Sequence, residues 1–265
     1  MFNTPFAFMA APAGGYDADA QAFFDRVTAA GGSLTTPEKN ATNTLVLDLK
    51  GYSIWADIQV AYPMVGGSNA SCRQNLKSSS FTGTFNGGWT FSASGADPDG
   101  VDGTYMDTAW NPSVVSDVNN NHYGIYTTQD QGGAYATYGV FDGFTKRWFM
   151  FLSFGADSYF EQGNALLLWA NSGVNKGFSF ANCDAGTLTG YVAGSSLGTQ
   201  SYADDGAPNG NFWFGATNRL QPLGVATGMA VNIAFATLGY KMNATKVANY
   251  YTAVQAFQTS LGRQV

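Results

Sequence analysis

The sequence has few of the side chains from which most catalytic and metal centres are built. It contains one histidine, His122, two glutamates, Glu38 and Glu161, and two cysteines, Cys72 and Cys183. A structural zinc site needs four nitrogen or sulfur ligands, more than these residues can assemble at one place. The sequence also contains no phosphate-binding loop and no dinucleotide-binding glycine motif. We therefore expect no metal ion and no cofactor.

The scarcity of glutamate also bears on hydrolysis of saccharides, which usually needs two carboxylates facing each other across a cleft. Glu38 lies at the start of an expected helix, and Glu161 lies in the turn-like stretch SYFEQGN with no carboxylate two residues away. His122 lies in NNNHYG, and a turn rich in asparagine predicts an exposed histidine without a catalytic role. The sequence therefore favours a protein that is not an enzyme, with a carbohydrate-active hydrolase as the alternative.

The scarcity of charge and the lack of long apolar runs each exclude one class of partner. Only 11% of the residues are charged, the net charge is −6, and the 12 basic residues form no cluster. Nucleic-acid binding needs clustered lysine and arginine, so we expect no nucleic-acid partner. No apolar run is long enough to span a bilayer, which predicts no membrane insertion. The apolar start MFNTPFAFMAAPAGG has two prolines and no basic residue, so we do not expect it to be a signal peptide.

The two cysteines allow one disulfide at most. The spacing of Cys72 and Cys183 does not show whether they meet. Small secreted scaffolds usually carry more cysteines, so two free thiols in a reducing compartment are the simpler interpretation.

Glycine and aromatic residues are abundant, which is typical of a mostly β protein with tight turns. The chain has 33 glycines among 265 residues, and 15% of its residues are aromatic. Alternating or continuous apolar runs predict strands at 123–128, 134–141, 147–156, 165–170, 177–181, 187–193, 211–216 and 229–238. A further pair of strands is expected within 81–93, as a hairpin around Asn86-Gly87-Gly88. Strands at such spacing predict a two-sheet sandwich.

Helices are expected at both ends of the chain. Asp17 or Asp19 can cap a first helix that ends at Gly31-Gly32, and Thr35 with Glu38 forms a capping pattern for a second that ends at Gly51. Residues 53–58 can add one turn. Near the C-terminus, Asn243 is expected to cap an amphipathic helix. Its apolar stripe comprises Val247, Tyr250, Tyr251, Val254, Phe257 and Leu261.

These patterns divide the chain into three parts. Residues 1–16 form an apolar arm, 17–58 form a helical segment packed on the sandwich, and 59–265 form the sandwich with its closing helix. The arm residues expected to dock on another protein are Phe2, Pro5, Phe6, Phe8 and Met9. Packing of the arm on its own domain remains the alternative.

Longer blocks of the sequence resemble a known group. FWFGATNRL (212–220) followed by GMAVNIAFATLGYKMNATKVANYYTAVQAF (228–257) resembles the end of concanavalin A-like (laminin-G-like) jelly rolls. LKGYSIWADIQVAYPMVGGSNASCRQNLK (49–77), FNGGWTFSASGADPDGVDGTYMDTAWNPS (85–113) and YYTAVQAFQTSLGRQV (250–265) resemble blocks of virion structural proteins of tailed bacteriophages. The resemblance runs from about Asp17 to Val265.

The resemblance implies an antiparallel jelly-roll sandwich with an N-terminal helix pair and a C-terminal helix, carried on a bacteriophage virion. The expected location is a capsid-surface fibre, a decoration protein, or a tail or baseplate component, assembled in the host cytoplasm. The expected partners are other virion proteins bound through the arm, further copies of the chain in a trimer, and host cell-surface glycans. The group supplies no binding residues that can be carried over.

Two sets of residues remain as candidate ligand sites. Asp97, Asp99 and Asp102 crowd the stretch ADPDGVDG, which offers carboxylates to a Ca²⁺ ion, but the preferred interpretation is a solvated turn, in which Asp and Gly are the expected residues. For saccharides, aromatic residues in loops can stack on the pyranose ring. The candidates for that role lie in or near expected loops: Tyr105, Trp110, Asn111 and Tyr123.

Overall fold

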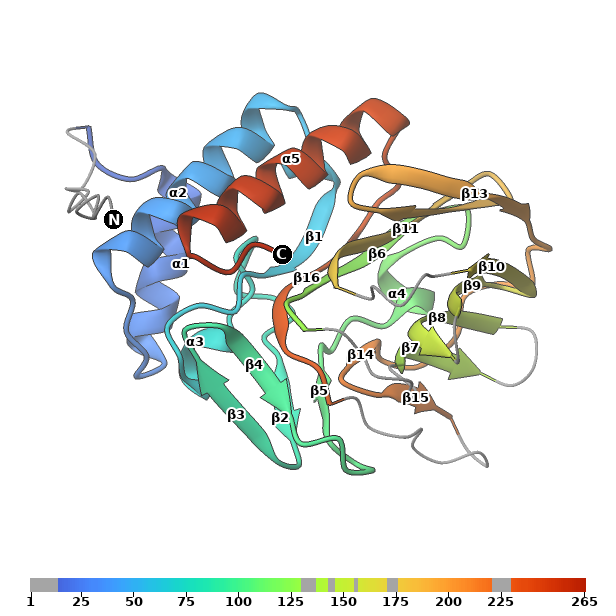
Figure 1. Ribbon diagram of the computed structural model, residues 1–265, viewed down its shortest axis with the longest axis horizontal. Helices are drawn as coiled ribbons and strands as arrows, with labels where there is room; N and C mark the ends of the chain where they lie inside the picture. Colours follow the sequence, from blue (N-terminus) through green and yellow to red (C-terminus); the bar gives the residue numbers. More distant parts are fainter. Residues whose placement is uncertain (1–13, 130–136, 143–145, 155–156, 171–175, 221–229) are drawn as a thin grey trace, which may run out of the picture.

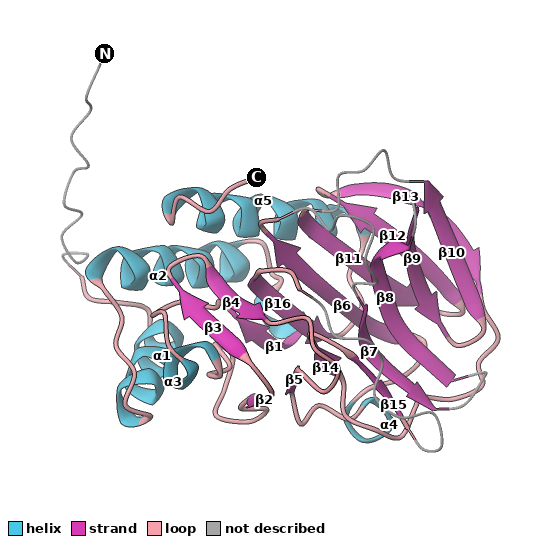
Figure 2. Ribbon diagram, turned by 60° about the horizontal axis from the view of Figure 1, so that its bottom comes forward, coloured by secondary structure: helices cyan, strands magenta, loops and turns pink. Residues whose placement is uncertain are grey.

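The computed structural model describes residues 14–129, 137–142, 146–154, 157–170, 176–220 and 230–265. The arm residues Phe2, Pro5, Phe6, Phe8 and Met9 therefore lie outside the described residues, and their docking role stays a prediction. The described chain is mostly β and folds into two sheets packed as a sandwich, with helices from both ends of the chain on one side (Figures 1 and 2). The predicted fold class is confirmed.

Among the described residues, long helices lie near both ends of the chain, and three short helical pieces lie in connections. They are α1 (Ala18–Ala29), α2 (Thr36–Gly51), the 3-10 turn η1 (Trp55–Asp57), α3 (Asn69–Cys72), α4 (Pro112–Val115) and α5 (Ala244–Ser260). Among the described helices, none combines the length and the hydrophobicity needed to cross a bilayer.

The strands are short and mostly follow one another through tight turns. They are β1 (Ile58–Tyr62), β2 (Thr84–Asn86), β3 (Trp89–Ser92), β4 (Gly95–Pro98), β5 (Tyr105–Asp107), β6 (Asn120–Thr127), β7 (Thr137–Asp142), β8 (Lys146–Phe154), β9 (Asp157–Gln162), β10 (Ala165–Ala170), β11 (Gly177–Asp184), β12 (Thr187–Val192), β13 (Ser195–Ser201), β14 (Trp213–Phe214), β15 (Thr217–Arg219) and β16 (Ile233–Gly239). Residues 134–136, 155–156 and 229 of the predicted strands lie outside the described residues.

Two sheets divide these strands. The first has the order β13-β12-β11-β6-β16-β4-β3, and β1 pairs with β16. The second has the order β10-β9-β8-β7-β14-β5-β2, and β15 joins β7 as a parallel neighbour. Other pairings are antiparallel, and β6 lies between β11 and β16, which are far from it in sequence (Figure 1).

The hairpin predicted within residues 81–93 is wrong. β2 pairs with β5 in the second sheet, whereas β3 pairs with β4 in the first. The chain crosses from one sheet to the other at Gly87, whose φ is +79° and whose position leaves no room for a β carbon beside Thr104. The Asn-Gly-Gly stretch therefore makes a corner between sheets, because glycine is equally suited to a corner and to a hairpin turn.

The N-terminal helices begin and end where their caps predict. Asp17 accepts a hydrogen bond from the Asp19 N–H (3.0 Å), and Thr35 and Glu38 form a reciprocal capping box. Helices α2 and α5 lie side by side on the outer face of the first sheet, and α1 packs against α2 and α3 (Figures 1 and 2). The boundaries proposed at residues 16 and 58 remain predictions.

The C-terminal helix α5 is also as predicted. Asn243 caps it by accepting a hydrogen bond from the Lys246 N–H (2.9 Å). Of its predicted stripe, Val247, Tyr250, Val254 and Phe257 are buried, and Tyr251 and Leu261 are half-buried. The molecule therefore has two apolar layers, one between the sheets and one between the first sheet and the helices.

A buried arginine fixes the chain after α5. The Arg263 side chain donates to the carbonyl oxygens of Met64 (2.8 Å), Pro63 (3.1 Å) and Ala234 (3.0 Å), and to Gln258 Oε1 (2.8 Å). Burial lowers the pKa of Arg263 to about 10, so the guanidinium stays protonated at neutral pH. This group ties the C-terminal segment to β16 and to the segment after β1.

Candidate functional site

Among the described residues, the long helices α2 and α5 pack on the first sheet, whereas the outer face of the second sheet is a broad strand surface. Side chains along β8 alternate between the inner and the outer face of this sheet. Trp148 and Met150 belong to the core between the sheets, whereas Phe149 and Phe151 belong to neither core layer. β8 is therefore apolar on both faces.

Neighbouring strands continue this surface, which we call the aromatic face. It comprises Tyr105 of β5, Trp213 of β14, Phe141 of β7, Phe149 and Phe151 of β8, and Tyr159 of β9. Trp213 lies opposite Gly139 in the strand ladder, and Gly139 lies opposite Phe149, so no side chain separates the two rings along that row.

One end of the aromatic face is a stacked pair. The rings of Tyr105 and Trp213 lie 3.7 Å apart between centroids at 10°, and both residues are half-buried. Asp107 lies opposite Trp213 in the ladder between β5 and β14. Its carboxylate accepts hydrogen bonds from the Ala109 N–H (2.8 Å) and from the Asn211 side chain (3.2 Å). A carboxylate has about four lone-pair positions, so Asp107 retains acceptor capacity for a ligand.

The rest of the aromatic face is a chain of edge-to-face contacts. Ring centroids are 6.2 Å apart for Phe141 and Phe149, 5.0 Å for Phe149 and Phe151, and 6.0 Å for Phe151 and Tyr159. Phe149 is only 8% exposed, while Phe141, Phe151 and Tyr159 are half-buried. Such pairs hold each ring in a fixed orientation.

An ion pair crosses this chain of rings. Arg147 Nη1 lies 3.0 Å from Glu161 Oε2, and the guanidinium lies 5.6 Å from the centroid of the Phe141 ring. Glu161 is buried, and burial raises its pKa although the positive charge of Arg147 acts in the opposite direction. The carboxylate is therefore occupied by Arg147 rather than facing a second carboxylate.

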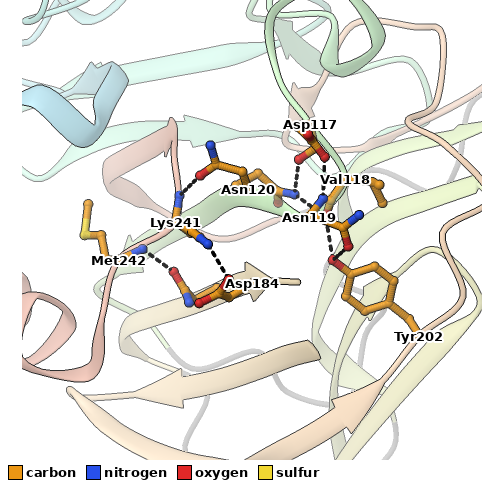
Figure 3. A network of polar contacts seen from close by, with 10 residues as sticks. Asp117, Val118, Asn119, Asn120, Asp184, Tyr202, Lys241 and Met242 are labelled. Carbon is orange, nitrogen blue, oxygen red and sulfur yellow. Dashed lines mark hydrogen bonds and ion pairs between the residues drawn. The ribbon is translucent and has the colours of Figure 1, made fainter. Parts of the chain in front are cut away.

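A network of polar contacts, drawn in Figure 3, lies where the loops at one end of the sandwich meet. The Lys241 ammonium pairs with Asp184, and the Lys241 N–H donates to Asn120 Oδ1 (3.1 Å). The Met242 N–H donates to Asn182 Oδ1 (2.7 Å). These contacts fasten the link between β16 and α5 to the ends of β6 and β11.

The other half of this network surrounds the turn before β6 (Figure 3). The Tyr202 hydroxyl donates to the Val118 carbonyl (2.5 Å), and the Asn119 N–H donates to Asp117 (2.8 Å). Asn119 Nδ2 donates to Asp204 (2.7 Å). Because these polar groups are satisfied by one another, the network has a structural role.

The structure places the four saccharide candidates very differently. Trp110 and Tyr123 are each 1% exposed, so the prediction that their rings can stack on a saccharide is wrong. Trp110 turns inward and donates from Nε1 to Gln59 (2.8 Å), and Tyr123 lies in β6 and belongs to the core between the sheets. Tyr105 belongs to the aromatic face. Asn111 caps α4 and donates to Asn209 Oδ1 (3.0 Å).

The prediction that His122 is exposed is also wrong. It is completely buried in β6, with its imidazole between the layers of helix and sheet. Nδ1 lies 2.6 Å from the Tyr240 carbonyl oxygen and Nε2 lies 3.1 Å from Thr237 Oγ1. Burial lowers its pKa to about 4, although the hydrogen bond to Tyr240 acts in the opposite direction. The imidazole is a neutral, fully satisfied part of the core.

The acidic stretch at 96–103 forms a turn held by internal contacts. Asp99 accepts hydrogen bonds from the Thr104 hydroxyl (2.7 Å) and the Val101 N–H (3.0 Å), and Asp97 accepts one from Asn232 (3.0 Å). Within the described residues, no group of three or more His, Cys, Asp or Glu side chains is arranged to hold a metal ion. Asp102 joins no such group.

The two cysteines are buried and do not pair. Cys72 and Cys183 are both free thiols with no exposed surface. Burial raises the pKa of Cys72 to about 12 and raises that of Cys183 as well, so both stay protonated.

Most of the aromatic face was missed from the sequence. Phe149, Phe151, Tyr159 and Trp213 all lie in strands, where aromatic residues are ordinarily assigned to the core. The signal was present in RWFMFLSF, which is apolar on both faces although an outer strand face of a sandwich normally carries polar residues.

Comparisons with known proteins support the fold. No protein-family model matches the chain, and no curated protein matches it. Among solved structures, the binding domain of botulinum neurotoxin serotype D matches 76% of this chain with 8% identity and a TM-score of 0.52. A structure of botulinum neurotoxin type C, whose cell entry depends on interaction with two ganglioside molecules, matches 77% with 9% identity and a TM-score of 0.54. The chain spans about half the length of each, 52% in both cases, and the likeness establishes the shared sandwich fold.

Proposed function

We propose that this chain is a non-enzymatic glycan-binding protein and that the aromatic face is its binding surface. The observation that carries the proposal is the Tyr105–Trp213 stack beside Asp107, on a sheet face that the helices leave uncovered in the described structure. The stack holds the Trp213 ring in a fixed position, so little side-chain freedom is lost when a ligand binds.

The chemistry of this group suits a saccharide. A pyranose presents apolar C–H groups on one side and hydroxyl groups around its edge, so it needs an aromatic platform and nearby hydrogen-bond acceptors. Trp213 supplies the platform, and Asp107 supplies carboxylate oxygens already oriented by Ala109 and Asn211. Phe141 and Phe151 extend the platform for further sugar residues.

The comparisons with solved structures also support the proposal of glycan binding. One matching structure is a binding domain, and the other belongs to a toxin that interacts with gangliosides, molecules that carry saccharide head groups. Hydrolysis is less well supported. Glu38 accepts hydrogen bonds from Thr35 and from the Gly66 N–H (2.7 Å), and Glu161 pairs with Arg147, so both carboxylates are engaged in contacts within the fold.

The finer part of the proposal places the protein on a bacteriophage particle, as a capsid-surface or tail component. It rests on the sequence blocks at 49–77, 85–113 and 250–265. Residues 1–16 would anchor the chain to other virion proteins, and a trimer would multiply weak glycan contacts by copy number. Mass spectrometry of purified particles tests this part, and absence of the chain from particles would contradict it without affecting glycan binding.

Binding itself is tested with an array of cell-surface glycans, followed by titration of each retained glycan. We expect Trp213→Ala to weaken binding by at least about tenfold. Trp213→Phe is expected to retain part of the affinity. The matched control is Trp55→Ala, because Trp55 is also half-buried but lies on the helical side under Lys77. Equal loss in the Trp213 and Trp55 variants, or no retained glycan, would contradict the proposal.

A further inference from the structure

Three buried polar atoms near the Figure 3 network have no hydrogen-bond partner in the protein. They are Asn121 Oδ1, Gln162 Oε1 and Trp148 Nε1. All three residues are completely buried. Buried polar groups are nearly always hydrogen-bonded, so three unpartnered atoms from neighbouring positions call for a common partner.

The fold brings these side chains to one place between the sheets. Asn121 lies on β6 of the first sheet, and its Nδ2 donates to the Val118 carbonyl (2.9 Å). Gln162 lies on β9 of the second sheet, and its Nε2 donates to the same oxygen (3.0 Å). Trp148 is the direct neighbour of Gln162 across the ladder between β8 and β9. Tyr202 also donates to the Val118 oxygen (Figure 3).

The atoms divide into two acceptors and one donor. The amide nitrogens of Asn121 and Gln162 are engaged with carbonyl oxygens, which fixes their oxygens as the unpartnered atoms. The Trp148 indole can only donate. A water molecule complements this set, because it donates two hydrogen bonds and accepts others. Buried waters typically make about three such bonds.

We infer that one ordered water is an integral part of this protein, donating to Asn121 Oδ1 and Gln162 Oε1 and accepting from Trp148 Nε1. A monovalent cation fits less well. It would take the two amide oxygens but would face the positive end of the indole N–H, which can only donate.

The water links the two sheets beneath the proposed binding surface. β8 and β9 carry Trp148 and Gln162 on their inner side and Phe149, Tyr159 and Glu161 on the outer side. The bridge to Asn121 fastens these strands to β6, the central strand of the first sheet. The inference does not depend on glycan binding.

Nuclear magnetic resonance of the intact, ¹⁵N-labelled chain tests the inference through the indole N–H groups. We expect a cross-peak between Trp148 Hε1 and a long-lived water. The internal control is Trp110, which is equally buried but donates to Gln59 Oε1 at 2.8 Å and should show no such cross-peak. Trp148→Phe assigns the signal. Tyr202→Phe removes the nearby hydroxyl, so a surviving cross-peak is not relayed by that hydroxyl.

Gln162→Leu removes one acceptor and is expected to abolish the Trp148 cross-peak while leaving the Trp110 signal unchanged. If that variant does not fold, the unmodified protein still decides the question. A high-resolution crystal structure should show one density peak within about 3.2 Å of all three atoms. No water cross-peak at Trp148, a direct bond from its indole to Gln162, or a peak that depends on the Na⁺ or K⁺ concentration would overturn the inference.

Discussion

Acidification should destabilise this protein through its only histidine. His122 is buried and neutral, between the Tyr240 carbonyl and Thr237, with its ring 5.0 Å from that of Phe180. Protonation would place a charge in this core and disturb the contact with Thr237. The folded state therefore binds the proton less readily than the unfolded state does.

The magnitude follows from the two pKa values. The pKa of His122 is about 4 in the folded protein against 6.5 for an unperturbed histidine. At about 1.4 kcal/mol per pKa unit, the difference corresponds to about 3 kcal/mol. This stability is present above pH 6.5 and is lost as the pH falls towards 4. Between pH 7 and pH 5, where most carboxylates remain ionised, we expect a loss of about 2 kcal/mol.

Urea denaturation at pH 7 and pH 5 measures this loss. His122→Gln removes the only histidine, so the difference in pH dependence between the two proteins isolates its contribution. It also separates His122 from Glu161, whose raised pKa favours the folded state on acidification. The imidazole resonances of the unmodified protein give the pKa directly. A titration midpoint at or above 6, or equal pH dependence in both proteins, would refute the reasoning.

Three further predictions concern packing and chemical reactivity. Phe257→Ala should lower the free energy of unfolding by about 3–5 kcal/mol because Phe257 is only 2% exposed, whereas exposed Thr252→Ala should change it little in the same denaturation assay. Arg263→Leu should cost more than about 2 kcal/mol, because several buried hydrogen bonds lose their donor; a normal melting temperature would contradict this. Cys72 and Cys183 should react with a thiol reagent only after unfolding, and rapid reaction in the folded protein would show that they are accessible.

The sequence correctly predicted the helix caps, which depend only on neighbouring residues. The caps at Asp17, Thr35 and Asn243 depend on residues within four positions, and all three are present in the structure. The two-sheet sandwich followed from strand spacing and composition. The corner at Gly87 was misassigned because the choice between a hairpin and a crossing depends on distant strands such as β5.

The candidate site was harder to predict because the tertiary fold decides whether a side chain is buried and on which face of a sheet it lies. Trp110 and Tyr123 lie near turns in sequence, yet the fold directs both into the core. His122 follows three asparagines, but its strand, β6, is the central strand of the first sheet. Trp213 joins Tyr105 only because β14 pairs with β5, a contact between segments more than a hundred residues apart.

The central claim is that the aromatic face binds a saccharide, and the indole N–H spectrum tests it most directly. A glycan retained on the array is titrated into ¹⁵N-labelled protein while the resonances of the six tryptophans are followed. We expect the Trp213 signal to shift with saturation and the Trp55 signal to stay in place. Shifts confined to Trp55 and the helical side, or saturable binding that leaves Trp213 unchanged, would contradict the claim.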